Sequence, residues 1–330
     1  FMLRLCKLKH LLCFMAGLTL ACAAFGADAY PSKPVTILVP YPAGGLSDVV
    51  ARIVAKPLGD RLGQPVVVEN SGGAAGAIGV QKVLASPADG YYVLQGSPSS
   101  LVLSPLINPA IKYKSDDLRM LQVVVESDFL LVARQDLPVT TADELAALAR
   151  ASGVKQPLSY GSIGTGSFHH LIGNRFSKVI GAQTVHVPYK GITPLMQDLI
   201  GQRVDFAMLP YSKSLAEFAA QRQVKILGSL SKERIPALQP IPSVNEGKAL
   251  KDFNFSIWSA YFVRKDTPEP VVKKLHLALS EVLHAPSVRE SLEAQGQKVP
   301  RLLSNAEAEK FYQESFVQFR ALAKEIALKE

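Results

Sequence analysis

Short apolar runs alternate with amphipathic stretches along most of the chain. Val35–Val39 is a run of mostly β-branched residues that stops at Pro40, which predicts a buried strand. Leu46–Leu62 follows with apolar residues at helical spacing. The same patterns predict further strands at 65–69, 92–95, 121–134, 158–160, 185–187, 204–208, 224–227 and 255–264. They predict further helices at 77–85, 141–150, 167–179, 193–201, 268–283 and 305–329. Short buried strands that alternate with helices indicate an α/β fold with mainly parallel sheets.

The alternation falls into two halves, and no Pro/Ser-rich linker separates them. A length of 330 residues is enough for two domains. The long apolar run at 121–134 predicts a strand that leads from one half into the other. We therefore expect residues 27–125 and 253–330 to form lobe 1 and residues 126–252 to form lobe 2. The return crossing falls anywhere from about Gly228 to Trp258.

The first 26 residues differ from the rest of the chain. They hold three basic residues and no acidic one, followed by the apolar run Leu11–Phe25 and then by small residues. This order is typical of a secretory signal peptide. A membrane anchor is the weaker interpretation, because a spanning helix needs about 20 apolar residues. Cleavage after Gly26 and cleavage after Ala29 both fit the pattern.

Charge and cysteine content change once this segment is set aside. The whole chain carries a net charge of +8, whereas the remainder has 33 basic and 28 acidic residues, or +5. The three cysteines, Cys6, Cys13 and Cys22, all lie in the segment. The mature protein is therefore expected to have no disulfide, no thiolate metal site and no cysteine nucleophile. Its basic residues are scattered among acids, which argues against a nucleic-acid partner.

Four loops each follow a predicted strand: 40–48, 70–79, 161–167 and 186–191. In open α/β sheets, ligands bind beyond the carboxyl ends of the strands, where glycines and helix N-termini offer backbone N–H groups. For the first loop, a tight turn with Ser47 or Asp48 as helix cap is an equally good interpretation. The second lacks the G-x-G-x-x-G spacing, so no dinucleotide cofactor is predicted. The hydroxyls and N–H groups of the third suit a carboxylate.

The individual side chains of the sequence do not indicate a group of catalytic residues. His169 and His170 are adjacent, so they cannot face one point from a helix, and no acid accompanies them at metal-ligand spacing. One of them is expected to pack or cap, which leaves the other for a ligand. Asp205 lies in an apolar strand and needs a partner, and we favour a structural role over ligand binding. An exported enzyme that uses these groups as acid and base is therefore an alternative of lower rank.

Several motifs together resemble one family. The stretch Val39–Asp48, followed by Ala51 and Arg52, resembles the first signature of the tripartite tricarboxylate transporter substrate-binding proteins, the Bug receptors. The similarity continues at 87–91, 161–171, 187–191, 198–205, 242–246 and Trp258, in order along the mature chain.

The resemblance implies a type II-like, two-lobed periplasmic binding protein fold, with a ligand cleft between lobes of sheet and flanking helices. It implies a monomeric periplasmic receptor, without enzymatic activity, cofactor or metal, that delivers a small carboxylate to a membrane permease. In this family the carboxylate is held by backbone groups, small hydroxyls and water. Carried over by motif, the ligand-binding residues are Tyr41, Ala43, Gly44, Gly45, Asp48, Ser97, Ser99, Gly164, Thr165, Gly166, Ser167, His169, Tyr189, Lys190 and Gly191. For Lys190, a solvated surface lysine is the alternative.

One loop departs from the family pattern. The second loop of the family usually reads Asn-Arg-Pro-Gly-Ala-Gly-Gly, and here residues 70–76 read Asn-Ser-Gly-Gly-Ala-Ala-Gly. Loss of the Arg and the Pro makes the loop less charged, and whether it contacts the ligand stays open. A different ligand, or a sensory role in which the receptor signals to a membrane partner, would accommodate this change.

Overall fold

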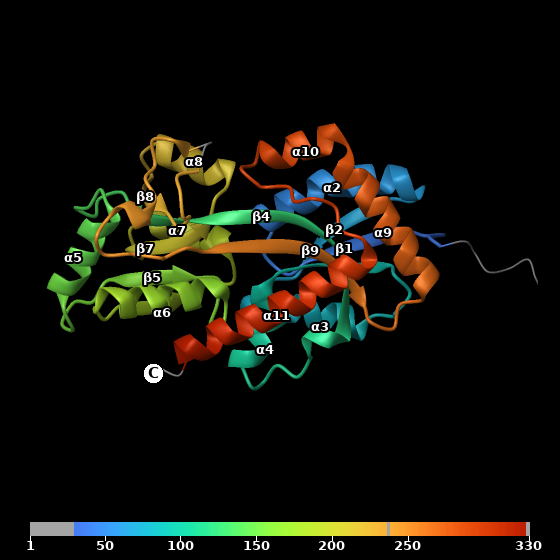
Figure 1. Ribbon diagram of the computed structural model, residues 1–330, viewed down its shortest axis with the longest axis horizontal. Coiled ribbons are helices and arrows are strands. Elements are labelled where there is room, and N and C mark those ends of the chain that lie inside the picture. Colours follow the sequence, from blue (N-terminus) through green and yellow to red (C-terminus); the bar gives the residue numbers. More distant parts are fainter. Residues whose placement is uncertain (1–29, 236–237, 328–330) are drawn as a thin grey trace, which may run out of the picture.

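A computed structural model describes residues 30–235 and 238–327. The predicted signal peptide lies outside the described residues. The molecule is elongated, and two long strands run side by side along its length (Figure 1). Sheet strands flanked by helices lie at both ends of these two strands.

The strands form one mixed sheet in the described part of the chain, in the order β2-β1-β3-β9-β4-β7-β5-β6, with β8 also paired to β4. The strands are β1 (Val35–Val39), β2 (Val66–Asn70), β3 (Tyr92–Gly96), β4 (Leu118–Arg134), β5 (Ser159–Ser162), β6 (Val185–Pro188), β7 (Phe206–Pro210), β8 (Val224–Ser229) and β9 (Ser256–Arg264). The strands β1, β2 and β3 are parallel, and so are β5, β6 and β7. The pairs that involve β4 or β9 are antiparallel.

Helices cover both ends of the sheet. They are α2 (Leu46–Leu62), α3 (Ala77–Ala85), α4 (Ser104–Ile107), α5 (Ala142–Ser152), α6 (Phe168–Ile180), α7 (Ile192–Ile200), α8 (Lys213–Ala220), α9 (Glu269–His284), α10 (Pro286–Glu293) and α11 (Asn305–Ala327). Local signals set several of their starts. Thr141 and Glu144 form the predicted capping box of α5, and Ser167 caps α6. None of the helices in the described ranges is long and apolar enough to span a membrane.

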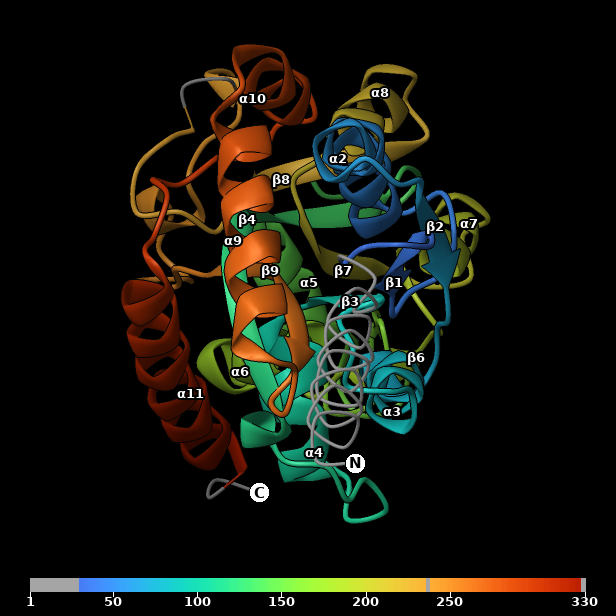
Figure 2. The same ribbon diagram turned by 90° about the vertical axis from the view of Figure 1, so that its right-hand side faces the viewer.

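The two lobes form around separate groups of parallel strands. Lobe 1 contains β1, β2 and β3 with α2, α3, α9 and α10, and lobe 2 contains β5 to β8 with α5 to α8 (Figures 1 and 2). The strand β4 runs from lobe 1 into lobe 2, as its long apolar run predicts, and β9 runs back beside it. The predicted two-lobed α/β fold is confirmed, and the lobe boundaries at 125/126 and 252/253 stay a prediction.

The segment after β3 was not predicted as a helix. It continues as a π-helical turn at Ser99–Leu103 and then as α4. All five residues of the turn are buried. This turn lies between the carboxyl end of β3 and the N-terminus of α6, because the backbone N–H of Phe168 donates to the Oγ of Ser99 at 3.0 Å. It thereby joins the two lobes beside the cleft.

Candidate ligand-binding site between the lobes

A cavity lies where the two lobes meet the long strands. Lobe 1 and the crossing strands line it with Tyr41, Leu46, Ser47, Val50, Gln95, Ser97, Ser99, Val125, Ser127, Ile257, Trp258 and Ser259. Lobe 2 lines it with Ile163, His169, Ile192 and Pro210. No Lys, Arg, Asp or Glu is among these lining residues. About half of the lining side chains are apolar, and the others carry a hydroxyl, an amide or a ring nitrogen.

Three lining side chains are deeply buried and keep polar atoms without a partner. His169 is 3% exposed, and neither of its ring nitrogens has a hydrogen-bond partner. The same holds for Nε1 of Trp258, which is 6% exposed, and for Oε1 of Gln95, which is 2% exposed. A buried polar atom without a partner costs about 1–3 kcal/mol, so such atoms are uncommon in proteins. Four of them, on three side chains around one cavity, indicate a place for a polar ligand.

Packing fixes the orientation of these side chains. The indole of Trp258 contacts the rings of Phe262, Phe311 and Tyr312. The ring of His169 packs edge-on against Phe129 at 5.1 Å between centroids. Burial lowers the pKa of His169 to about 3, so its imidazole is neutral near pH 7. The site therefore offers neutral hydrogen-bonding groups on rigid supports.

The first turns of three helices contribute residues to the cavity wall. Leu46 and Ser47 at the start of α2 line the cavity, and the cap residue Gly45 offers no side-chain cap. Ile192 at the start of α7 lines it too, and α7 likewise lacks a side-chain cap. His169 is the second residue of α6. Uncapped helix N-termini carry free N–H groups and about half a positive charge, which favours an anion without any lysine or arginine.

The loop after β1 is held in shape by Asp48. The carboxylate of Asp48 accepts the Gly44 N–H at 2.9 Å and pairs with the Nε of Arg52 at 3.0 Å. Burial alone would raise the pKa of Asp48, but the hydrogen bonds from Arg52 and Gly44 outweigh burial and lower it. On the other side of the loop, the Tyr41 hydroxyl lies 3.0 Å from the Oγ of Ser97. Asp48 thus builds the loop that carries Tyr41 to the cavity wall.

The predicted site residues fall into three groups in space. Tyr41, Ser97, Ser99 and His169 line the cavity itself. Gly44 and Gly45 line an adjoining groove, and this groove shares Leu46, Ile192 and Pro210 with the cavity. The remaining predicted residues are not among the lining residues of the cavity: Ala43, Asp48, Gly164, Thr165, Gly166, Ser167, Tyr189, Lys190 and Gly191.

Two residues of the third group, Gly164 and Ala43, lie where the lobes touch. A Cβ on Gly164 would lie 3.0 Å from the backbone nitrogen of Ala75, which belongs to the divergent second loop. The Oγ1 of Thr193 donates to the carbonyl of Ala43 at 3.4 Å. The second loop therefore contacts the opposite lobe, although none of its residues lines the cavity.

The polar residues of the fourth loop lie away from the cavity. The Tyr189 hydroxyl donates to Asp198 at 2.9 Å, and Lys190 is exposed. Thr165 is also exposed. Of the two adjacent histidines, His170 stacks on His186 with 4.0 Å between ring centroids, while His169 faces the cavity. The expectation that one packs and the other is available to a ligand agrees with this arrangement.

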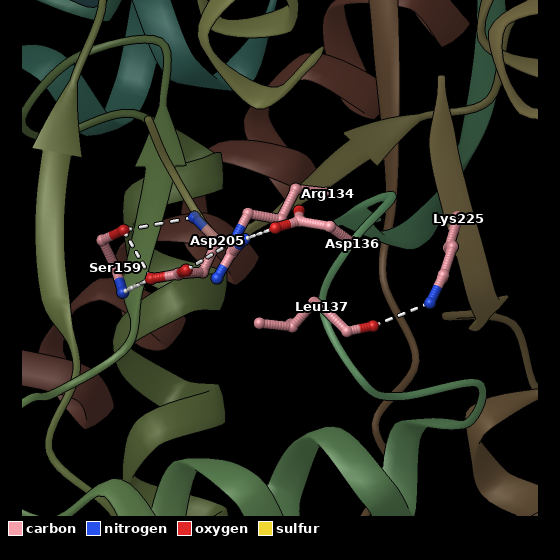
Figure 3. A network of polar contacts seen from close by, with 6 residues as sticks. All are labelled: Arg134, Asp136, Leu137, Ser159, Asp205 and Lys225. Atoms are coloured by element: carbon pink, nitrogen blue, oxygen red, sulfur yellow. Dashed lines mark hydrogen bonds and ion pairs between the residues drawn. The ribbon is translucent and has the colours of Figure 1, made fainter. Parts of the chain in front are cut away.

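Asp205 has the structural role that the sequence favoured. Its carboxylate accepts hydrogen bonds from the backbone N–H and the hydroxyl of Ser159 at 2.7 and 2.8 Å, and it pairs with the Nε of Arg134 at 2.8 Å (Figure 3). Arg134 also pairs with Asp136. The network ties β4, β5 and the start of β7 together at the end of lobe 2. The hydrogen bonds and the ion pair of the Asp205 carboxylate are thus all made within the folded chain.

Sequence reasoning missed Gln95 and the polar residues of the long strands. Gln95 was predicted only as a strand residue, and Trp258 only as part of a motif. Ser127 and Ser259 also line the cavity. A signal was present, because Gln95 and Ser127 are polar residues inside otherwise apolar strands, as Asp205 is. That pattern shows that a polar group is buried, but it does not show what the group faces.

Comparison with known proteins places the chain in a family. The family model described as tripartite tricarboxylate transporter family receptor matches residues 50–328. The UPF0065 protein in the TAR-I ttuE-ttuC' intergenic region of Agrobacterium vitis is 38% identical over 270 residues, which is 82% of this chain and 77% of that protein. Protein BugT of Bordetella pertussis is 33% identical over 278 residues, or 83% of each.

Solved structures show the same fold. The periplasmic binding protein BugD is 32% identical, with a TM-score of 0.75 and coverage of 90% of this chain and 96% of BugD. An R. palustris protein solved with adipate is 27% identical, with a TM-score of 0.83 and coverage of 90% and 98%. MatC from Rhodopseudomonas palustris, with bound malate, is 25% identical, with a TM-score of 0.81 and coverage of 89% and 100%. This chain therefore belongs to the tripartite tricarboxylate transporter receptor family of periplasmic binding proteins.

Proposed function

We propose that the protein is a periplasmic receptor that encloses a small organic acid between its lobes and delivers it to a membrane permease. The observation that carries this proposal is the set of unpaired polar atoms on His169, Trp258 and Gln95 around the cavity between the lobes. Solved relatives with bound malate and adipate support a carboxylate as the ligand.

A carboxylate suits the hydrogen-bond donors of this cavity. Its oxygens accept hydrogen bonds from the Trp258 indole N–H and from the N–H of a neutral His169. The N-termini of α2 and α7 stabilise its negative charge. Hydrogen bonds to a charged group contribute about 1.5–3 kcal/mol each, so two or three of them account for selective binding without an arginine.

Binding and release would follow from closing and opening of the cleft. The ligand contacts groups of both lobes, so it favours the closed arrangement by its difference in affinity for the two states. The closed receptor then presents a joint surface of both lobes to the permease. We propose that the segment 1–26 directs export and that the mature receptor acts as a monomer.

The proposal includes binding without turnover. In the described ranges, no group of three or more His, Cys, Asp or Glu residues could hold a metal ion. His169 is neutral and has no carboxylate partner, so it lacks the oriented acid or base that catalysis needs. A bound acid recovered with unchanged mass would support this, and conversion of the acid would favour an exported enzyme.

The chain supplies its own probe for the binding test. Trp258 is the single tryptophan of the sequence, and it lines the cavity. A panel of organic acids should therefore change the tryptophan fluorescence of the purified mature protein. At 100 times its Kd, a ligand should also stabilise the protein by about 2.7 kcal/mol. If no acid of a broad panel changes fluorescence or melting temperature, the proposed function is wrong.

Delivery to a permease needs a test in cells. Deleting the gene should abolish uptake of the acid that binds in vitro, and a plasmid copy should restore it. If uptake persists while a transcriptional response to the acid is lost, the receptor serves sensing and not transport.

A further inference from the structure

The amide of Gln95 has one defined orientation in the cavity wall. Gln95 lies on β3, and its Nε2 donates to the backbone carbonyl of Ser47 at 3.0 Å. A carbonyl accepts hydrogen bonds only, so the nitrogen must face Ser47. The Oε1 atom is then the free one, and it is buried without a partner. It can only accept a hydrogen bond.

Trp258 has the opposite requirement. Its Nε1–H is a donor only, whereas a neutral His169 offers one donor and one acceptor. A ligand that forms hydrogen bonds with these unpaired atoms must therefore present an acceptor to Trp258 and a donor to Gln95. A carboxylate supplies the acceptor. An ionised carboxylate has no donor, so a second functional group must serve Gln95.

The charge of the wall limits what this second group is. An ammonium group would be a donor, but no Asp or Glu lines the cavity to stabilise its charge. A second carboxylate would be anionic and could not donate to Gln95. Its charge would also lack a Lys or Arg among the lining residues. A hydroxyl or an amide N–H meets the requirement, because both donate without carrying charge.

The wall also has an apolar part, beside the hydroxyls of Tyr41, Ser47, Ser97, Ser99, Ser127 and Ser259. Leu46, Val50, Val125, Ile163, Ile192, Pro210 and Ile257 line the cavity beside the ring of Trp258. Such a surface favours a hydrocarbon body, because binding then removes apolar surface from water. The polar groups of the ligand are then expected at its ends, with an apolar segment between them.

We infer that the cavity selects a monocarboxylic acid with an apolar body and an uncharged hydrogen-bond donor, a hydroxyl or an amide N–H, which Gln95 recognises. This inference rests on the proposed function and adds the chemistry of the second end of the ligand. Gln95 is the residue that determines specificity, and the helix N-termini with Trp258 and His169 bind the acid.

The test compares acids that differ only at one end. One series is benzoate, 4-hydroxybenzoate, 4-carbamoylbenzoate, terephthalate and 4-(aminomethyl)benzoate. The other is hexanoate, 6-hydroxyhexanoate, adipamate, adipate and 6-aminohexanoate. Isothermal titration calorimetry with the purified mature protein measures each Kd. In at least one series, the hydroxy and amide acids should bind about tenfold or more tightly than the other three, because those leave Gln95 unpaired or bury a second charge.

The variant Gln95→Met tests the assignment to this side chain. Met has a similar length and needs no donor, so the preference should fall to about threefold or less, because the unsubstituted acid no longer leaves a buried amide oxygen unpaired and should bind more tightly than it does to the wild-type protein. Trp258→Phe keeps an aromatic ring but removes the N–H, so it should weaken all acids of a series alike. Unfolding curves of both variants verify that they fold.

The outcomes separate this inference from the proposed function. If in both series the unsubstituted acid, the diacid or the amino acid binds the wild-type protein as tightly as the hydroxy and amide acids or more tightly, the inference is overturned and the receptor function stays intact. A preference that survives in folded Gln95→Met would overturn the role of Gln95. If no acid of either series or of the broad panel binds, both are wrong. Because the wild-type series alone decides the ligand class, a variant that fails to fold does not block the test.

Discussion

Gly191 of lobe 2 packs against the ring of Pro42 of lobe 1 across the cleft. A Cβ on Gly191 would lie only 2.5 Å from the Cδ of Pro42. The backbone of Gly191 is extended, with φ of 172°, so any residue could adopt it. Space across the cleft is therefore what requires glycine here.

Substitution of Gly191 should hold the cleft open. In Gly191→Val the side chain meets Pro42 only in the closed state, so the open protein avoids the clash. We expect the Kd of the bound acid to rise at least about tenfold while the free energy of unfolding changes by less than about 1 kcal/mol. Calorimetry and small-angle scattering with and without ligand check this.

Gly72 provides the matched comparison. A Cβ on Gly72 would lie 2.8 Å from the same Cδ of Pro42, but both residues belong to lobe 1. Opening of the cleft cannot relieve this clash, so Gly72→Val should lower stability as well as binding. Wild-type affinity in Gly191→Val would show that closure does not bring these residues together.

Asp205 should matter for stability and not for the ligand. Asp205→Ala leaves the Ser159 N–H and the Arg134 guanidinium without their acceptor in a partly buried place. We expect a loss of about 2 kcal/mol in the free energy of unfolding and no more than a small change in Kd. The exposed pair of Arg203 with Asp198 is the control, because Arg203→Ala should cost less than about 1 kcal/mol. A large loss of affinity in folded Asp205→Ala would contradict the structural role.

His169 should make the unliganded protein less stable in acid. The unfolded state binds a proton at His169 near the ordinary pKa of about 6.5, whereas burial lowers the pKa in the folded state to about 3. The unfolded state therefore binds more protons between these values, and stability falls as the pH drops. From pH 7 to pH 5 this one group should cost about 2 kcal/mol.

His169→Gln should remove that part of the pH dependence. Urea unfolding at pH 7 and pH 5 measures it in both proteins. Some dependence of stability on pH should remain in the variant because of His186. Burial, together with the nearby charge of His170, lowers the pKa of His186 to about 4. An unchanged slope in the variant would show that His169 is not held neutral by burial.

Asp48 should act on binding through the loop and not by contact. Asp48→Ala frees the Gly44 N–H and Arg52, so the loop that carries Tyr41 loses its support. We expect about a tenfold rise in Kd and a loss of about 1–2 kcal/mol in stability. Asp48→Asn keeps an acceptor for Gly44 and should recover most of both. Equal defects in the two variants would assign the effect to the charge of Asp48.

Much of the fold could be predicted because its signals are local. The β-branched run Val35–Val39 and the capping box of Thr141 with Glu144 act within a few residues, and both elements form where expected. The long run that became β4 also predicted a strand that crosses between the lobes. The π-helical turn at Ser99–Leu103 was missed, because its shape depends on buried contacts with lobe 2.

The sequence by itself determined the alternation of strands and helices, the glycine-rich loops at the strand ends and the need of Asp205 for a partner. These follow from periodicity, from backbone N–H groups and from the cost of burying a charge. Only the tertiary structure decided that Gln95 and Trp258 face the cavity beside His169, while Lys190 faces solvent. The reason is that the direction of a side chain along a strand or loop depends on sheet register and on the packing of distant segments, which no local pattern records.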